Sequence, residues 1–224
     1  ALAPGAQAEL FGEHATFRIG SLPLSVAVSD FDRDGNPDVA VANTSSGTVS
    51  VLRGRPDGGF TSQSTFAVAP FPTSVAAADF NDDDRSDLAV AYDGGVAVML
   101  GDGRGGFAPH TTFATGADPN AVAITDINRD GDPDLVVASH TDHSVSVLLG
   151  GVGGSFGSRT DHAVGHIADA VVAEDFNGDG RPDLAVTGYQ ARVVTVLPGD
   201  AGGGFGPPAR FPIGEGGNSL AAGG

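Results

Sequence analysis

Four copies of one nine-residue acidic segment, spaced 49, 47 and 49 residues apart, constrain this chain more than any other feature. The copies read DFDRDGNPD (30–38), DFNDDDRSD (79–87), DINRDGDPD (126–134) and DFNGDGRPD (175–183). Glycine-rich turns ending in phenylalanine form a second series at Phe11, Phe60, Phe107, Phe156 and Phe205, with steps of 49, 47, 49 and 49. Two landmarks with one period indicate that a single supersecondary unit is repeated along the chain.

Each unit contains four short apolar stretches with the period of two that is typical of β-strands. In the first unit we expect them at 25–30, 38–43, 48–54 and 65–69, joined by turns rich in glycine, proline and aspartate. Valines alternate with smaller residues, so one face of each strand points inward. No stretch longer than a turn has the periodicity of an amphipathic helix. Four strands in 47 to 49 residues are typical of a β-propeller blade, whereas β-solenoid repeats are shorter.

We therefore predict an all-β fold, a β-propeller built of four-stranded antiparallel blades, with about four blades in the chain. A single domain, 1–224, holds repeats at about 24–70, 71–116, 117–165 and 166–214. An extra outer strand is expected at 11–20, and a partial fifth repeat, the truncated start of the next blade, at 215–224. Three arrangements stay open: a closed four-bladed ring, a homodimer that completes a larger propeller ring, and a fragment of a longer protein.

The pairing of a D-x-[DN]-x-D-G-x-x-D loop with a G-x-G-G-F turn resembles the FG-GAP/VCBS repeats. These repeats build the propeller of integrin alpha chains and of many secreted bacterial and fungal proteins. The resemblance covers about residues 11–214 and implies a propeller in which each acidic loop joins the first two strands of a blade and binds Ca²⁺. In that family, side chains at loop positions 1, 3, 5 and 9 and the backbone carbonyl at position 7 supply the oxygen ligands.

Applied to this sequence, the resemblance predicts up to four calcium sites, with the carbonyls coming from position 7. The predicted ligands are Asp30, Asp32, Asp34, Asn36 and Asp38; Asp79, Asn81, Asp83, Arg85 and Asp87; Asp126, Asn128, Asp130, Asp132 and Asp134; and Asp175, Asn177, Asp179, Arg181 and Asp183. The second loop has Asp84 at the bend where the others have glycine. Aspartate tolerates a left-handed backbone less freely than glycine, so we expect this site to be the weakest.

Charge supports the calcium prediction independently. The loops hold 16 of the 28 acidic residues of a chain with a net charge of −17, and carboxylates packed so closely repel one another unless a cation neutralises them. Ca²⁺ accepts about six to eight oxygen ligands in a tolerant geometry, whereas Mg²⁺ requires a strict octahedron. An EF-hand needs glutamate at position 12, which is valine in all four loops. Plain hairpin turns are the alternative, although a turn needs only one or two such residues.

The acidic charge argues against nucleic acid and against anionic membranes as partners, because both require basic residues. No apolar run is long enough to insert into a membrane, no signal peptide is present in this chain, and cysteine is absent. The family resemblance implies a secreted or extracellular protein.

No catalytic constellation is evident, and we predict that the chain is not an enzyme. The nucleophile elbow, the phosphate-binding loop and the dinucleotide fingerprint are all missing from the sequence. In propellers, function resides in the variable loops, and the loop residues suited to recognition are Tyr92, His140, His143, Tyr189 and Arg192. We expect a module for recognition of a glycan or protein ligand, or for scaffolding. The alternatives are an accessory domain or fragment of a larger secreted hydrolase or adhesin and, for these loops, ordinary solvated turns.

Overall fold

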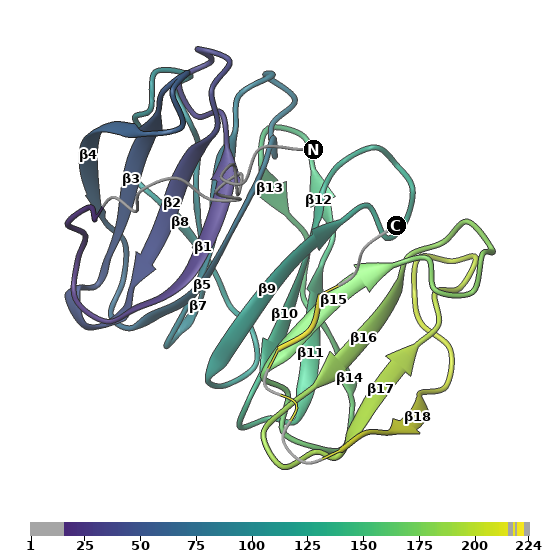
Figure 1. Ribbon diagram of the computed structural model, residues 1–224. Helices are drawn as coiled ribbons and strands as arrows, with labels where there is room; N and C mark the ends of the chain where they lie inside the picture. Colours follow the sequence, from purple (N-terminus) through teal and green to yellow (C-terminus); the bar gives the residue numbers. More distant parts are fainter. Residues whose placement is uncertain (1–15, 215–216, 218, 222–224) are drawn as a thin grey trace, which may run out of the picture.

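The computed structural model describes residues 16–214, 217 and 219–221. Four antiparallel sheets of four strands stand side by side, and each sheet uses consecutive segments of the chain (Figure 1). We number these sheets as blades 1 to 4. Blade 1 consists of β1 (Pro23–Ser29), β2 (Asp38–Asn43), β3 (Thr48–Gly54) and β4 (Phe60–Ala67), and the short 3-10 turn η1 (Thr44–Ser46) joins β2 to β3.

The other blades repeat this order. Blade 2 consists of β5 (Pro72–Ala78), β6 (Asp87–Tyr92), β7 (Gly95–Met99) and β8 (Thr111–Phe113). Blade 3 consists of β9 (Pro119–Thr125), β10 (Asp134–Ser139), β11 (Ser144–Leu148) and β14 (Thr160–Ala163), with the hairpin of β12 (Gly150–Gly151) and β13 (Ser155–Phe156). Blade 4 consists of β15 (Ala170–Glu174), β16 (Asp183–Thr187), β17 (Val193–Leu197) and β18 (Ala209–Pro212). The predicted architecture of four-stranded propeller blades is confirmed.

The first strands of the blades, β1, β5, β9 and β15, contact one another in turn and form the inner edge of the molecule. Side chains link them across the blade boundaries: the Val75 amide donates to Ser25 Oγ at 3.1 Å, and the Val122 amide donates to Ser74 Oγ at 3.3 Å. Thr73 Oγ1 donates to the Pro119 carbonyl at 2.7 Å. These contacts hold the inner strands of successive blades in register.

Proline shapes the entry to three of these inner strands. Leu22, Phe71 and Asp118 have φ angles of 55°, 54° and 58°, and each precedes the proline that opens β1, β5 or β9. Proline disfavours the right-handed helical region for the residue before it, and here that residue takes the left-handed one. The fourth copy has Ala168 in place of the proline, and Ile167, the residue directly before it, has no positive φ.

The core consists of three clusters, each between two neighbouring blades. Between blades 1 and 2, for example, Ala40 and Val49 of one sheet pack with Leu88 and Val90 of the next. Small β-branched and alanine side chains allow the sheets to approach closely, and such interiors are densely packed. The core is therefore a series of similar interfaces, each with its own set of repeat-related residues.

One repeat position shows where the described stack of blades ends. Val75, Val122 and Val171 are only 5%, 8% and 6% exposed, because each packs against the preceding blade. Val26 occupies the same position in β1 and is 64% exposed. Among the described residues, no blade covers that side of blade 1.

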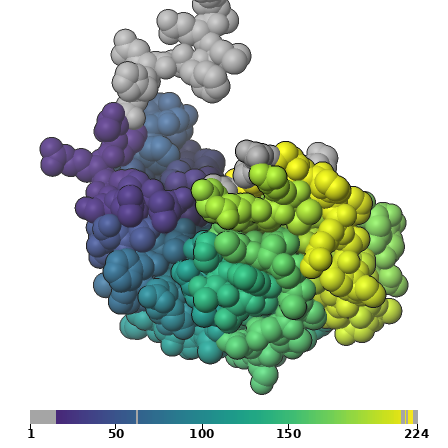
Figure 2. Space-filling view, turned by 90° about the horizontal axis from the view of Figure 1, so that it is seen from below, coloured from purple at the N-terminus to yellow at the C-terminus, as the bar shows by residue number. Residues whose placement is uncertain are grey.

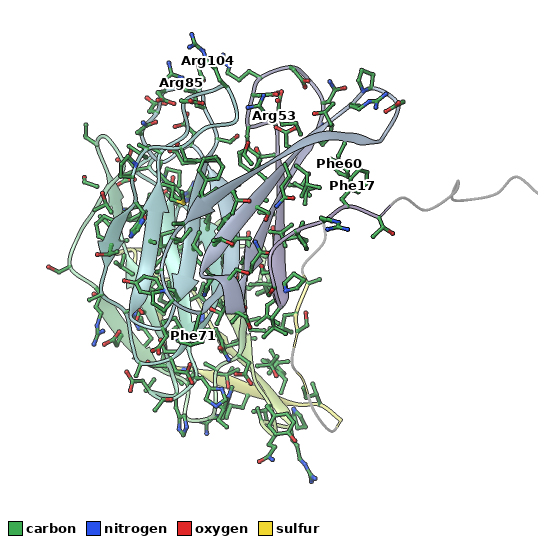
Figure 3. All side chains as sticks on the ribbon, turned by 90° about the vertical axis from the view of Figure 1, so that its left-hand side faces the viewer. Phe17, Arg53, Phe60, Phe71, Arg85 and Arg104 are labelled. Carbon is green, nitrogen blue, oxygen red and sulfur yellow. The ribbon has the colours of Figure 1, made fainter. Side chains whose placement is uncertain are left out.

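Aromatic pairs join neighbouring blades at their outer edge. An outer-strand side chain meets the phenylalanine of the next glycine-rich turn, edge to face, in the pairs Phe66–Phe107, Phe113–Phe156 and His162–Phe205, each with ring centroids 5.1 Å apart. Phe17 lies against Phe60 in the same way, with ring centroids 5.2 Å apart (Figure 3). Phe211, the next copy of this position, is 54% exposed.

This repetition yields a matched pair of substitutions. Phe66→Ala removes a ring packed between blades 1 and 2, and we expect it to lower the free energy of unfolding by about 2–3 kcal/mol. Phe211→Ala makes the same chemical change at an exposed copy, and we expect an effect below about 0.5 kcal/mol. Urea unfolding of both variants measures the difference; equal effects would contradict the interlocking role of these rings.

The outer strand expected at 11–20 is wrong where the structure describes it. Residues 16–20 form no strand, because their backbone pairs with no described strand edge, and Phe17 makes contact through its ring alone. Residues 11–15 lie outside the described part. Of the partial repeat at 215–224, Ser219 and Leu220 line a pocket beside the four inner strands, and 217 and 219–221 form no strand. In the described residues, no helix has the length and apolarity required to cross a membrane.

Candidate functional site

The four acidic loops lie at one end of the blades, where each inner strand passes into its second strand. Arg53, Arg85 and Arg104 mark this acidic-loop end in Figure 3, and Phe71 marks the opposite end, which we call the mouth end. In the first loop, oxygens of Asp30, Asp32 and Asp38 all lie within 4.8 Å of one another. The structure thus brings together three of the four side chains predicted to bind metal there.

Asp34 is not part of this group. Its Oδ1 accepts hydrogen bonds from the Asn36 backbone amide at 2.8 Å and from Asn36 Nδ2 at 2.9 Å. The equivalent aspartates, Asp83, Asp130 and Asp179, likewise accept the backbone amide two residues further on, at 3.0, 2.9 and 2.9 Å. Position 5 therefore closes the turn of every loop, and it keeps a second oxygen for other partners.

The aspartate at position 1 organises the loop backbone. Asp30 accepts the amides of Asp34 at 3.1 Å and Gly35 at 2.8 Å with its two oxygens. The same pair of bonds recurs at its three repeat equivalents, Asp79, Asp126 and Asp175. Since a carboxylate oxygen has more than one lone pair, these bonds leave acceptor capacity for a cation.

The aspartate at position 9 is buried and connects three segments through its hydrogen bonds; we call this arrangement the buried lock. Asp87 accepts the Phe80 amide at 2.9 Å and the Gly101 amide at 2.7 Å, which ties the loop start and the third strand to the second strand. The repeat equivalents Asp38, Asp134 and Asp183 make the same pair of bonds. From the sequence, these residues were predicted only as metal ligands, and the structure gives them a second, architectural role.

The glycine partner of this lock was missed from the sequence. It is Gly54, Gly101, Gly150 or Gly199, and a Cβ at any of these positions would collide with the backbone carbonyl of the residue just before the locking aspartate. Close approach of two backbones requires glycine here. A glycine at this point of every repeat was the available signal.

Burial raises the pKa of Asp38, Asp87 and Asp134, although their two backbone hydrogen bonds act in the opposite direction. Neighbouring loop carboxylates raise these pKa values further, Asp32 and Asp30 in the case of Asp38. Ionisation of these carboxylates therefore lowers the stability of the folded loops. A bound cation would offset that cost.

Position 3 supplies the clearest unsatisfied groups. Asp32 Oδ1 and Asn81 Oδ1 are both buried and have no hydrogen-bond partner in the described protein. The other carboxylate oxygen of Asp32 lies 3.7 Å from Arg53 Nε. Buried oxygens without a donor are costly, and the same position carries one in both the first and the second loop.

The bend residue of the second loop has the backbone predicted for it. Asp84 has a φ of 60°, while the equivalent glycines Gly35, Gly131 and Gly180 have φ angles of 86°, 97° and 81°. A left-handed backbone costs a residue with a side chain roughly 1–2 kcal/mol. All four bends therefore have a left-handed backbone, and among these four residues only Asp84 has a side chain that makes this backbone strained.

We expect Asp84→Gly to raise the free energy of unfolding by about 0.5–1 kcal/mol, because the relieved strain exceeds the extra entropy of glycine in the unfolded chain. Gly35→Ala is the converse change; no atom lies within 4 Å of the added Cβ, so its expected loss of about 1 kcal/mol comes from the backbone. Denaturant titrations of both variants test the pair. Destabilisation by Asp84→Gly would refute the assignment of strain.

The five residues predicted to bind a ligand lie on or beside the loops of the mouth end. Tyr92 packs partly against the core between blades 1 and 2. His143 and Arg192 have positive φ angles, and their carbonyls accept the amides of Val164 and Ile213. His140 and Tyr189, in contrast, converge on one acidic residue. The structure brings two of the five together.

That residue is Asp169, at the junction of blades 3 and 4. Its Oδ1 accepts Asn120 Nδ2 at 2.7 Å and lies 2.6 Å from His140 Nδ1, and its Oδ2 accepts the Tyr189 amide at 2.6 Å. Burial raises the pKa of Asp169, but these hydrogen bonds lower it by more, so the net pKa is below the ordinary value. The carboxylate stays ionised at neutral pH.

A pocket of about 370 Å³ opens here, lined by Leu24, Thr73, Asn120, Asp169 and Tyr189. Figure 2 looks onto this end, where the purple first blade meets yellow-green segments of the fourth. Asn120 and Asp169 were not predicted from the sequence. They share one repeat position with Leu24 and Thr73, and a change from apolar to polar residues at that position was the signal.

Comparison with known families finds the FG-GAP-like repeat three times, over residues 30–90, 79–137 and 126–186. A lectin of Agrocybe aegerita, whose structure concerns specific recognition of non-reducing terminal N-acetylglucosamine, is 22% identical with a TM-score of 0.59; the match covers 82% of this chain and 50% of the lectin. BBS1N, solved in complex with ARL6DN, is 12% identical with a TM-score of 0.58, covering 87% of this chain and 55% of that one. The chain thus spans about half the length of either protein. No curated protein matches the sequence.

Proposed function

The chain belongs to the FG-GAP-like repeat family, and on that basis we propose that it is a non-enzymatic recognition module, stabilised by calcium, whose ligand is a glycan. The blades form the rigid scaffold, the acidic-loop end holds the metal and the mouth end meets the ligand. This division follows the general rule that function resides in the loops that a fold presents.

The observation that carries the calcium proposal is the pair of buried, partnerless oxygens at position 3, Asp32 Oδ1 and Asn81 Oδ1. A hard cation that prefers oxygen ligands satisfies such atoms, and it neutralises the carboxylates of Asp30 and Asp38 beside Asp32. The residues present therefore fit calcium. When bound, the ion supplies positive charge and a crosslink within the loop, and it performs no chemistry.

Calorimetric titration of metal-free protein with CaCl₂ tests this proposal. We expect up to four sites with dissociation constants of about 10⁻⁵–10⁻³ M, in the range of sensor and extracellular modules. Asp32→Ala should remove one site. Asp93→Ala, which deletes an exposed carboxylate at the mouth end, should leave the stoichiometry unchanged. Absence of any heat of calcium binding would overturn the proposal.

Calcium sites of that strength are filled outside cells, and for this reason we place the protein, or a larger protein that contains it, in a secreted or extracellular setting. Fractionation of the native source into cells and medium tests the location. Recovery from the cell interior alone would contradict it.

The glycan proposal rests on the polar pocket at the mouth end and on the fold shared with the Agrocybe aegerita lectin. A glycan array that includes chains ending in N-acetylglucosamine, probed with and without calcium, is the direct test. A protein ligand is the second candidate, because BBS1N has a similar fold and was solved in complex with ARL6DN. An array without any bound glycan would favour that candidate.

A further inference from the structure

We propose that the junction of blades 3 and 4 at the mouth end is a saccharide-binding subsite formed by Asn120, Asp169 and Tyr189, with His140 orienting Asp169. This inference rests on the proposed glycan-binding function and names the place where a sugar sits. Asn120 and Asp169 also line the neighbouring pocket that follows the inner strands. The pocket beside blade 1, lined by Thr44–Gly47 and Ala67–Phe71, contains no carboxylate.

The chemistry of the pocket selects a ligand rich in hydrogen-bond donors. Asp169 receives three hydrogen bonds, from Asn120, His140 and the Tyr189 amide, while a carboxylate has about four lone-pair positions. One acceptor position therefore remains. Asn120 Oδ1 receives no donor from the described protein. Thr73 Oγ1 directs its one proton toward the carbonyls of Pro119, at 2.7 Å, and Ala91, at 3.2 Å, so its lone pairs remain available as acceptors.

Neutral polyols match this excess of acceptors better than anions do. A sugar ring offers several hydroxyl donors on adjacent carbons, which can reach a carboxylate and an amide oxygen together. An anionic group would instead face the ionised Asp169, whose pKa lies below its ordinary value, in a chain with a net charge of −17. The volume of about 370 Å³ falls within the range of small-molecule pockets.

Tyr189 supplies an apolar surface at the rim. It is 53% exposed, and its backbone amide is fixed by Asp169 Oδ2 at 2.6 Å, so its loop is anchored to the polar centre of the pocket. An aromatic ring with a polar tip suits a ligand that is apolar on one face and hydroxylated at its edge. The apolar C–H face of a pyranose is such a surface.

The site is assembled before any ligand arrives. The Asp169 amide donates to the Thr187 carbonyl at 2.9 Å and the His140 amide donates to the Asp118 carbonyl at 2.9 Å, so both side chains start from fixed backbone. Asn120 lies on β9 and Asp169 lies just before β15, and Asn120 Nδ2 donates to Asp169 Oδ1 across the blade boundary at 2.7 Å. Preorganisation of this kind reduces the entropy lost on binding.

The test measures binding of the glycan selected by the array, using the full chain loaded with calcium. Tyr189→Ala removes the ring but keeps the backbone amide that Asp169 accepts, and Asn120→Thr substitutes the residue found at the same position in blade 2. We expect each variant to bind about tenfold more weakly, and Tyr189→Ala to keep an unchanged thermal melt. Phe71→Ala, which removes another exposed aromatic side chain at the mouth end, is the matched control and should bind within about twofold of wild type.

A spectroscopic reading comes from the composition of the chain, which has two tyrosines and no tryptophan. In Tyr92→Phe, Tyr189 is the only tyrosine, and saturating glycan should change its fluorescence.

Glycan binding that persists in Tyr189→Ala and Asn120→Thr, or that is lost in Phe71→Ala instead, would overturn the subsite and leave the proposed function standing. If Asn120→Thr proves unfolded, Tyr189→Ala and the fluorescence decide. A wild-type protein that binds no glycan would overturn both proposals.

Discussion

Removal of calcium with EGTA is expected to lower the melting temperature of this protein by several degrees for every loop that loses its ion. A ligand present at 100 times its dissociation constant stabilises the folded state by about 2.7 kcal/mol per site. For a chain of this size, 1 kcal/mol shifts the midpoint by roughly 2–4 °C, so one filled loop contributes roughly 5–10 °C. The reason is the burial of Asp38, Asp87 and Asp134, whose charge is costly without a cation.

Calorimetric or fluorescence melts at fixed ionic strength measure this effect. Magnesium at equal concentration is the control, because general screening of the 28 acidic residues would act with either ion. In Asp32→Ala the shift caused by calcium should be smaller by about one site, whereas Asp93→Ala should keep all of it. Identical melts in excess calcium and in EGTA would refute a stabilising role for the metal.

Substitution of Asp87 by asparagine is expected to lower the free energy of unfolding by about 3 kcal/mol, even without metal. Asp87 is completely buried and accepts the amides of Phe80 and Gly101 with its two oxygens. An asparagine amide group has a single acceptor oxygen, so its NH₂ would face one of these buried donors. A buried donor left without an acceptor costs about 1–3 kcal/mol, and the displaced backbone adds to this.

The matched control is Asp82→Asn in the same loop. Asp82 is exposed, and asparagine tolerates its φ of 58°, so the same chemical change should cost less than about 0.5 kcal/mol. Urea unfolding in EGTA compares the two variants without interference from calcium. Equal losses in both would show that charge, and not the buried lock, governs the stability of the loop.

The two variants should also differ in pH dependence. Since burial raises the pKa of Asp87, the folded metal-free state binds more protons than the unfolded state between the ordinary and the raised value. Stability therefore falls as pH rises through that window, and it stays reduced above it. Asp87→Asn should flatten this slope, and Asp82→Asn should retain it. Unfolding free energies measured from pH 3.5 upward test the sign.

The strands and the loops were predictable because both arise from local patterns. An alternation of valine with small residues encodes a strand with one inward face, as in 38–43, which is β2 from end to end. The acidic loops were predictable for the same reason, since their carboxylates are close in sequence. Residues 16–20 were mispredicted because a strand also requires a partner edge, which local sequence does not reveal.

The glycine of the buried lock depends on contacts between segments. Gly101 differs from other glycines only because Ser86 and Asp87 approach it across the sheet. The mouth-end pocket also depends on contacts between segments. Asn120 and Asp169 are 49 residues apart in sequence, and only the stacking of blade 4 on blade 3 places Asn120 Nδ2 2.7 Å from Asp169 Oδ1. Such pairs are separated by a whole repeat.

By itself, the sequence determined the blade, its period and its acidic loops, because the residues responsible lie within one turn or one strand of each other. The acidic segment at 30–38 thus predicted its own candidate ligands. The tertiary structure decided which of these aspartates also accept hydrogen bonds from backbone amides. It also decided that His140 and Tyr189 meet Asp169, while Tyr92 packs against the core. The physical reason is that contacts between blades depend on how whole sheets pack, and packing is a property of the assembled surfaces and not of any one segment.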